Sequence, residues 1–190
     1  MSSDLTMTNR CAHDARGAKG PDEDVEWCAI MLIVTTISLR PIGTVRSPFT
    51  DTAEIPRGPG AQHDAEGILE LRADLEPGLA DIDGFSHLYV LWLFDRSEGF
   101  DLLAHPPLDD RPHGVFATRS PRRPNPIGLT VVRLLRREGP HLHVRGLDML
   151  DGSPILDIKP YLSSVPPGEI RRGWLAEAES RGYPPRLDCR

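Results

Sequence analysis

A proline-rich segment at residues 117–128 (ATRSPRRPNPIG) carries the side chains best suited to binding an anion. They are Arg119, Arg122, Arg123 and Asn125, whose guanidinium and amide groups bind carboxylates, phosphates and base edges. Prolines at 121, 124 and 126 each remove a backbone donor and fix φ, which predicts a stiff loop rather than a helix or inner strand. A rigid loop with clustered cations favours ligand binding over a solvated surface turn.

Charge is unevenly distributed along the chain. The 190 residues carry a formal net charge of −6, which argues against a general nucleic-acid binder. Residues 111–137 nevertheless contain seven arginines and neither lysine nor acid. This layout is expected of a site that captures an anionic ligand or an RNA loop, although a solvated basic face explains the charge equally well.

A second polar group consists of Asp148, Asp151, Asp157 and Lys159. Asp151 begins an Asp-Gly turn signature. Asp157 and Lys159 are two positions apart on a predicted strand, so they share a face and can form an ion pair. Beside the arginine loop these residues indicate a mixed-charge cleft, and the residues alone leave its activity open.

Other familiar catalytic patterns are absent from the sequence. There is no GxGxxG dinucleotide fingerprint, no P-loop and no GxSxG nucleophile elbow. His141 and His143 share a strand face but lack a third ligand, so we expect no metal site. The three cysteines are far apart, which indicates a reducing compartment, and the apolar run at residues 29–39 is too short to span a membrane. We therefore expect a soluble cytoplasmic protein.

Short strands are the elements that must position these residues. Strands are predicted at residues 30–48, 67–71, 85–94, 115–118, 129–136 and 141–146, and on both sides of the Asp-Gly turn within 147–161. Brief helices are expected at residues 75–81 and 169–180. Many short strands separated by turns predict a single all-β domain, a barrel or sandwich. We place it at residues 29–167, between a disordered extension (1–28) and a C-terminal tail with a short helix (168–190).

Four blocks at residues 40–49 (RPIGTVRSPF), 56–60 (PRGPG), 79–94 and 114–161 carry a family resemblance. Through them the chain resembles the TrmO/TsaA-like family of S-adenosylmethionine-dependent methyltransferases. The resemblance implies a mainly antiparallel β-barrel that acts as a homodimer, with the cofactor near the subunit interface. The activity it implies is methylation of N6 of threonylcarbamoyladenosine at position 37 of a threonine tRNA.

Matching motifs imply a set of site residues. The cofactor-binding residues are Gly58, Pro59, Gly60, Asp95, Arg96, Arg119, Leu129, Met149, Leu150, Asp151 and Gly152. Arg119 is expected to pair with the cofactor's methionine carboxylate, and Leu129, Met149 and Leu150 to form an apolar wall. The substrate-binding residues are Arg122, Arg123, Asn125, Lys159 and Tyr161, with Tyr161 stacking on a base. Methyl transfer depends mainly on positioning and needs no metal, and Asp157 is the candidate acceptor of the amine proton.

Three functions follow from this reading. The first is the tRNA N6-methyltransferase, and the second is the same cofactor chemistry on a small-molecule acceptor. Asp95, which stands where many tRNA-modifying members carry histidine, supports the second, as do the short C-terminus and the acidic charge. The third is a non-catalytic barrel that binds RNA or a nucleotide. Salt-sensitive tRNA binding favours the first over the second, and failure to bind the cofactor favours the third.

Overall fold

The computed structural model describes residues 5–6, 37–55, 64–162, 164–166, 169–170 and 172–181. The chain divides into two compact units, Met1–Arg40 and Pro41–Arg190. In the first unit, β1 (Leu5–Thr6) pairs antiparallel with β2 (Ser38–Leu39). Most of the extension predicted to be disordered, and residues 30–36 of the strand predicted at 30–48, lie outside the described residues.

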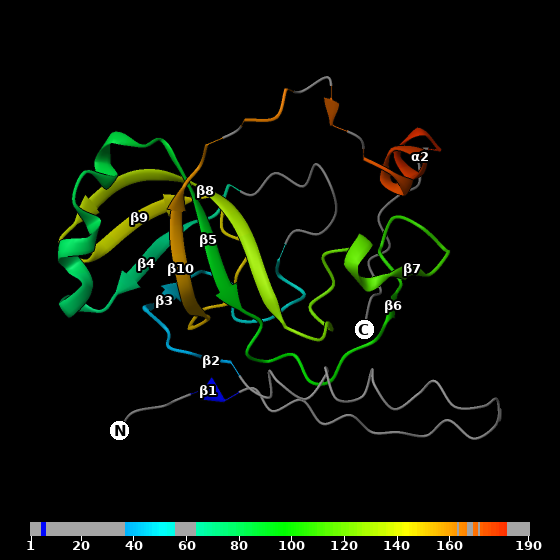
Figure 1. Ribbon diagram of the computed structural model, residues 1–190, viewed down its shortest axis with the longest axis horizontal. Helices are drawn as coiled ribbons and strands as arrows, with labels where there is room; N and C mark the ends of the chain where they lie inside the picture. Colours follow the sequence, from blue (N-terminus) through cyan, green and yellow to red (C-terminus); the bar gives the residue numbers. More distant parts are fainter. Residues whose placement is uncertain are drawn as a thin grey trace, which may run out of the picture. The chain divides into compact units, whose positions relative to one another are not determined.

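Six strands of the second unit close into a barrel in the order β10-β3-β4-β9-β8-β5 (Figure 1). These strands are β3 (Gly43–Arg46), β4 (Glu66–Leu71), β5 (His87–Leu93), β8 (Ile127–Glu138), β9 (His141–Arg145) and β10 (Pro154–Pro160). Every neighbouring pair is antiparallel. The structure thus confirms the all-β prediction and identifies the architecture as an antiparallel barrel.

Alternation of side chains along each strand fills the barrel. On β5, Leu88 and Val90 are fully buried, and on β8 Val132 is fully buried, whereas Leu129 and Val131 on β8 are 48% and 41% exposed. Because successive side chains of a strand point to opposite faces, one face of each strand packs into the core and the other faces outward. The outer face of β8 therefore carries uncovered apolar side chains beside the polar ones.

Two predicted strands are wrong. Residues 115–117 form the 3-10 helix η3 (Val115–Ala117), and the Thr118 hydroxyl donates to the Val115 carbonyl oxygen at 2.9 Å. Such local side-chain bonds compete with a sheet ladder. Residues 147–150 form no strand before the Asp-Gly turn, because the Leu147 amide donates to the Ala65 carbonyl oxygen and Met149 is buried in the core.

The remaining elements are short. The helix expected near residue 75 is the 3-10 helix η1 (Ala73–Leu79), which η2 (Ile82–Gly84) follows. The segment at residues 95–114, predicted to be loop, contains β6 (Leu103–Ala104) and β7 (His113–Gly114), which pair with each other. The C-terminal helix α2 (Trp174–Ser180) begins later than predicted.

Asp109 connects α2 to the β6–β7 region. Its side chain is only 3% exposed and accepts a hydrogen bond from the Arg111 guanidinium at 3.2 Å. Arg181, which follows α2 directly, reaches the same carboxylate oxygen at 2.7 Å. The hydrogen bonds from Arg111, and then that from Arg181, hold the pKa of Asp109 well below its usual range. This carboxylate is therefore a charged link between α2 and the β6–β7 region, beside the pair that Arg111 forms with Glu177 of α2 at 3.7 Å.

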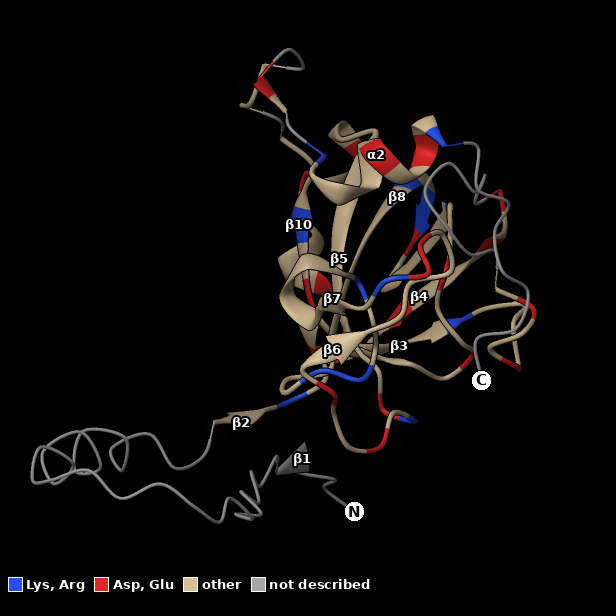
Figure 2. Ribbon diagram, turned by 90° about the vertical axis from the view of Figure 1, so that its right-hand side faces the viewer, with Lys and Arg blue, Asp and Glu red and all other residues tan. Residues whose placement is uncertain are grey.

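Trp174 at the start of α2 reinforces this link. Its ring stacks on His113 of β7 with the centroids 4.1 Å apart, and its indole N–H donates to the Ala117 carbonyl oxygen at 3.0 Å. The helix consequently lies against β7 and η3 to one side of the barrel (Figure 1 and Figure 2).

We expect Asp109→Asn to lower the melting temperature at pH 7 by several degrees, because Arg111 and Arg181 both lose their ion pair with this buried carboxylate. A carboxylate with a depressed folded pKa contributes stability above its unfolded pKa of about 3.9, and this is lost as pH falls towards the folded value. The difference between wild type and variant should therefore shrink below about pH 4. Thermal melts followed by tryptophan fluorescence test this, with the exposed Asp83→Asn as control. A difference that stays constant down to pH 3 would contradict the role of the charge.

Candidate functional site

Segments far apart in the sequence meet where β5 ends and β8 begins. The Phe94 amide donates to the Pro126 carbonyl oxygen at 2.8 Å, and Ser97 Oγ donates to that of Pro121 at 3.1 Å. Arg96 Nη2 donates to the Asp151 carbonyl oxygen at 2.5 Å. The segment after β5, the proline-rich loop and the Asp-Gly turn are thereby bonded into one assembly.

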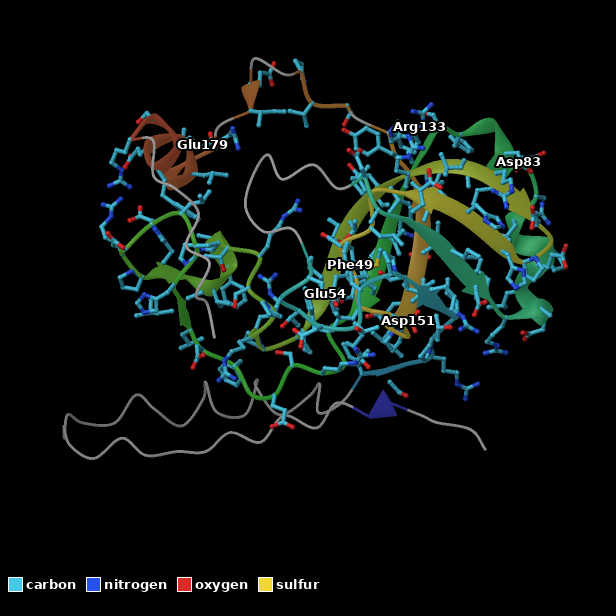
Figure 3. All side chains as sticks on the ribbon, turned by 180° about the vertical axis from the view of Figure 1, so that it is seen from behind. Phe49, Glu54, Asp83, Arg133, Asp151 and Glu179 are labelled. Carbon is cyan, nitrogen blue, oxygen red and sulfur yellow. The ribbon has the colours of Figure 1, made fainter. Side chains whose placement is uncertain are left out.

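The Asp151-Gly152 turn is fixed by hydrogen bonds to β3 and to the chain just after it. Asp151 Oδ1 accepts from the Ser47 amide at 3.0 Å, and the Asp151 amide donates to the Phe49 carbonyl oxygen at 2.8 Å. The Gly152 amide donates to the Val45 carbonyl oxygen at 2.8 Å, with φ of Gly152 at +81°. That left-handed backbone favours glycine, and Figure 3 labels Phe49 and Asp151 close to one another at this end of the barrel.

Two of the predicted substrate-binding arginines hold the proline-rich loop in place. Arg122 pairs with Asp101 at 2.7 Å and donates to the Glu98 carbonyl oxygen at 2.8 Å. The hydrogen bond from the Arg122 side chain to Asp101 lowers the pKa of that carboxyl group. Arg123 Nη2 donates to the Val115 carbonyl oxygen at 3.3 Å. Both guanidinium groups are already engaged within the protein, so they pre-shape the loop.

Arg119 and Asn125 are differently placed in the same loop. Both are exposed, and neither side chain makes a hydrogen bond or ion pair within the part of the chain that the structure describes. Arg96 is also exposed and donates to a backbone carbonyl rather than to an acid. Arg96, Arg119 and Arg123 are therefore the cations of this region that no described acid neutralises, and of these only Arg119 makes no hydrogen bond to described residues.

Other predicted residues lie on the outer face of β10, β5 and β8. Leu129 is opposite Leu91, and Leu91 is opposite Asp157, so one row across three strands joins a cofactor candidate to the proton-acceptor candidate. Asp157 pairs with Lys159 at 2.7 Å, as their spacing predicted, and its side chain is 44% exposed. Tyr161, directly after β10, is 42% exposed.

The three residues expected to form an apolar wall, Leu129, Met149 and Leu150, do not all face the same way. Met149 is fully buried and Leu150 is 9% exposed, so both side chains belong to the core, whereas Leu129 faces outward. Asp95 is exposed beside Arg96. The predicted residues Gly58, Pro59 and Gly60 lie outside the described residues.

Sequence reasoning missed the buried polar chain that supports the site. Trp92 Nε1 donates to Thr130 Oγ1 at 3.0 Å, and Thr130 Oγ1 donates to Asp148 Oδ1 at 2.5 Å. This chain anchors the segment that leads into the Asp-Gly turn. Gly128 lies against the Trp92 ring, where an added Cβ would be 2.3 Å from Cε2. The sequence showed only that Trp92, Thr130 and Asp148 can form hydrogen bonds. It did not show that they bond to one another, because the partners are 38 and 18 positions apart.

A surface hollow of about 380 Å³ lies away from this region, lined by Ala73, Glu76, Pro77, Ala80 and Arg137. Arg137 donates there to Glu76 and to the Leu79 carbonyl oxygen, so its guanidinium group is already paired with an acid of the protein. The described residues include no group of three or more His, Cys, Asp or Glu side chains able to hold a metal ion. In the described part of the chain, no helix has the length and apolar character needed to cross a membrane.

Residues 44–166 match the sequence model of the tRNA-methyltransferase O N-terminal domain. The chain belongs to this family. It is 44% identical over 146 residues to a probable S-adenosyl-L-methionine-binding protein of Pyrococcus abyssi, covering 76% of this chain and 79% of that protein. The resemblance carried by the four sequence blocks is confirmed.

Two further relatives are longer than this chain. The mouse protein named tRNA (adenine(37)-N6)-methyltransferase is 38% identical over 130 residues, which cover 65% of this chain and 30% of the mouse protein. The crystal structure of TrmO from Pseudomonas aeruginosa superposes with a TM-score of 0.60 at 38% identity, covering 73% of this chain and 62% of that one. The chain thus spans less than two thirds of each.

Proposed function

We propose that the protein is an S-adenosylmethionine-dependent methyltransferase that modifies N6 of threonylcarbamoyladenosine at position 37 of tRNA. The observation that carries the proposal is the match to the TrmO family over residues 44–166, which contain all three segments bonded together at the end of the barrel. The named methyltransferase among the relatives supports the reaction type.

The residues present fit S-adenosylmethionine. Arg119 and Arg96, which no described acid neutralises, can bind the carboxylate of the cofactor. Gly152 is exposed and has no side chain, so the cofactor can approach its backbone. Leu129, 48% exposed, offers apolar surface. When bound, the cofactor supplies a methyl group activated by a sulfonium cation. The Asp151 carboxylate, fixed by the Ser47 amide, is compatible with that positive charge.

Positioning is the main contribution that these residues can make to methyl transfer. An in-line displacement needs the acceptor nitrogen held close to the methyl carbon and away from competing water. Asp157 lies in the same cross-strand row as Leu129 and is half-exposed, so it can accept the proton that the amine loses. Lys159, 2.7 Å from Asp157, keeps that carboxylate oriented.

Exposed apolar side chains near β6 and η3 support the proposal that the enzyme acts as a homodimer, which we place in the cytoplasm, where tRNA is available. Four apolar residues there are exposed by 46% to 78%: Phe100, Leu102, Leu103 and Phe116. Exposed apolar groups of this size are typical of an interaction surface. They flank Asp101, the partner of Arg122, so a second copy covering them would lie beside the proline-rich loop.

We expect titration calorimetry to detect saturable binding of S-adenosylmethionine by the wild-type protein. Arg119→Ala should weaken it about 10- to 100-fold, because a charge-assisted hydrogen bond to the carboxylate is lost. The matched control is Arg136→Ala, whose guanidinium is paired with Glu138 at 2.8 Å and should not affect binding. Absence of binding by the wild type would contradict the enzyme proposal, and normal binding by Arg119→Ala would contradict the role of that residue.

We expect Phe116→Ser to shift the protein from dimer to monomer in light scattering, because the most exposed of the four apolar residues loses its contact. Ile170→Ser, at an exposed apolar position outside β6 and η3, is the control and should leave the mass unchanged. A wild-type protein that is monomeric at all concentrations tested would contradict the proposed dimer.

A further inference from the structure

The outer face of β10, β5 and β8 carries an array of side chains in three rows. Strand register and the hydrogen bond from the Tyr161 amide to the His87 carbonyl oxygen (3.0 Å) define the rows. The row nearest the proline-rich loop is Asp157, Leu91 and Leu129; the middle row is Lys159, Tyr89 and Val131; the far row is Tyr161, His87 and Arg133. The first row belongs to the candidate reaction centre and Lys159 and Tyr161 were already predicted to bind substrate, whereas the other four residues are new to the site.

Aromatic rings gather towards the far end of this array. The Tyr161 ring lies 5.0 Å from that of Tyr89 and 6.3 Å from that of His87, centroid to centroid. Tyr161 is 42% exposed and His87 is exposed as well. Partly exposed rings that already support one another provide a stacking surface for a base, since every base has a π face.

Arg133 supplies an unneutralised positive charge beside these rings. It is exposed and makes no hydrogen bond or ion pair with the described residues. Its neighbours differ: Arg145, opposite it on β9, is bound by Glu66, and Arg136 on the same strand is bound by Glu138. The charge of Arg133 is therefore available to an external anion.

The far row lies four residues along β8 from the row of the candidate reaction centre. Leu129 and Arg133 are four residues apart on β8, or about 13 Å at the usual rise per residue. Figure 3 labels Arg133 and Asp151 at opposite ends of the barrel. A short run of extended nucleotides can follow the face between these two ends.

We propose that this array binds the single-stranded nucleotides that flank the target base. Tyr161, supported by His87 and Tyr89, stacks on a neighbouring base, and Arg133 binds a backbone phosphate. Rings flanked by a free cation match a nucleic acid better than an apolar protein surface. The proposal rests on the proposed function, because it takes the target base to lie at the row of Leu129 and Asp157.

Fluorescence anisotropy with a labelled anticodon stem-loop of threonine tRNA tests the array. We expect Tyr161→Ala and Arg133→Gln each to weaken binding about tenfold, through loss of base stacking and of a phosphate contact respectively. Arg133→Gln should also lower the slope of log affinity against log salt by about one. Arg145→Gln, which removes a cation already neutralised by Glu66, is the matched control and should bind within about twofold of wild type.

Two conservative variants guard against misfolding as an explanation. Tyr161→Phe keeps the ring and should bind like wild type, and Arg133→Lys keeps the charge and should recover most of the affinity. All four variants should bind S-adenosylmethionine normally, since their side chains lie away from the loop assembly. Wild-type affinity for the stem-loop in both Tyr161→Ala and Arg133→Gln would overturn the proposal.

The outcomes also separate this proposal from the one on which it rests. If the two variants change the oligomeric state while leaving RNA affinity intact, the array contacts a second copy and the RNA proposal is wrong. If the wild type methylates tRNA while both variants bind the stem-loop normally, the proposal for the array is wrong and the proposed function stands. If the wild type binds the stem-loop through the array but transfers no methyl group, the proposed function is wrong and the RNA-binding role of the array stands.

Discussion

Closure of the barrel depends on how the chain turns into β10. This strand pairs with both β3 and β5, and it follows directly after the turn in which Asp151 and Gly152 bond to the chain at residues 45–49. The left-handed backbone of Gly152 makes that turn possible. The same turn presents the Asp151 carbonyl oxygen to Arg96. One local constraint therefore closes the fold and assembles the candidate cofactor site.

Pairing divides the arginines of residues 111–137 into structural and available groups. Four are bound by acids of the protein: Arg111, Arg122, Arg136 and Arg137. Arg123 is held by backbone carbonyl oxygens, which leaves Arg119 and Arg133 without partners among the described residues. These two lie in different places, one in the proline-rich loop and the other on the outer face of β8. Of the seven arginines in residues 111–137, only these two have a guanidinium group that no described residue binds, so their positive charge is available to an external ligand. Their positions indicate two contact points for anionic ligands.

Local patterns predicted the parts of the fold that depend on local physics. β-branched residues on β8, alternation on β9, the Gly139 turn between them and the apolar run of β5 identified those strands, and the three prolines identified the loop. The strand predicted at residues 115–118 failed because the Thr118 hydroxyl bonds locally. The row joining Leu129 to Asp157 could not be derived from local pattern, because it depends on the register of β5 with both β8 and β10. The acids that neutralise Arg122 and Arg137 likewise come from remote segments.

The central claim is that the site methylates a modified adenosine in tRNA. Its most direct test is to incubate the wild-type protein with S-adenosylmethionine and threonine tRNA that carries threonylcarbamoyladenosine, and to digest the product for nucleoside mass spectrometry. The account predicts conversion of that nucleoside at position 37 to a form heavier by one methylene, dependent on enzyme and cofactor. A protein that binds the cofactor but leaves the nucleoside unchanged would contradict it and would direct the search towards a small-molecule acceptor.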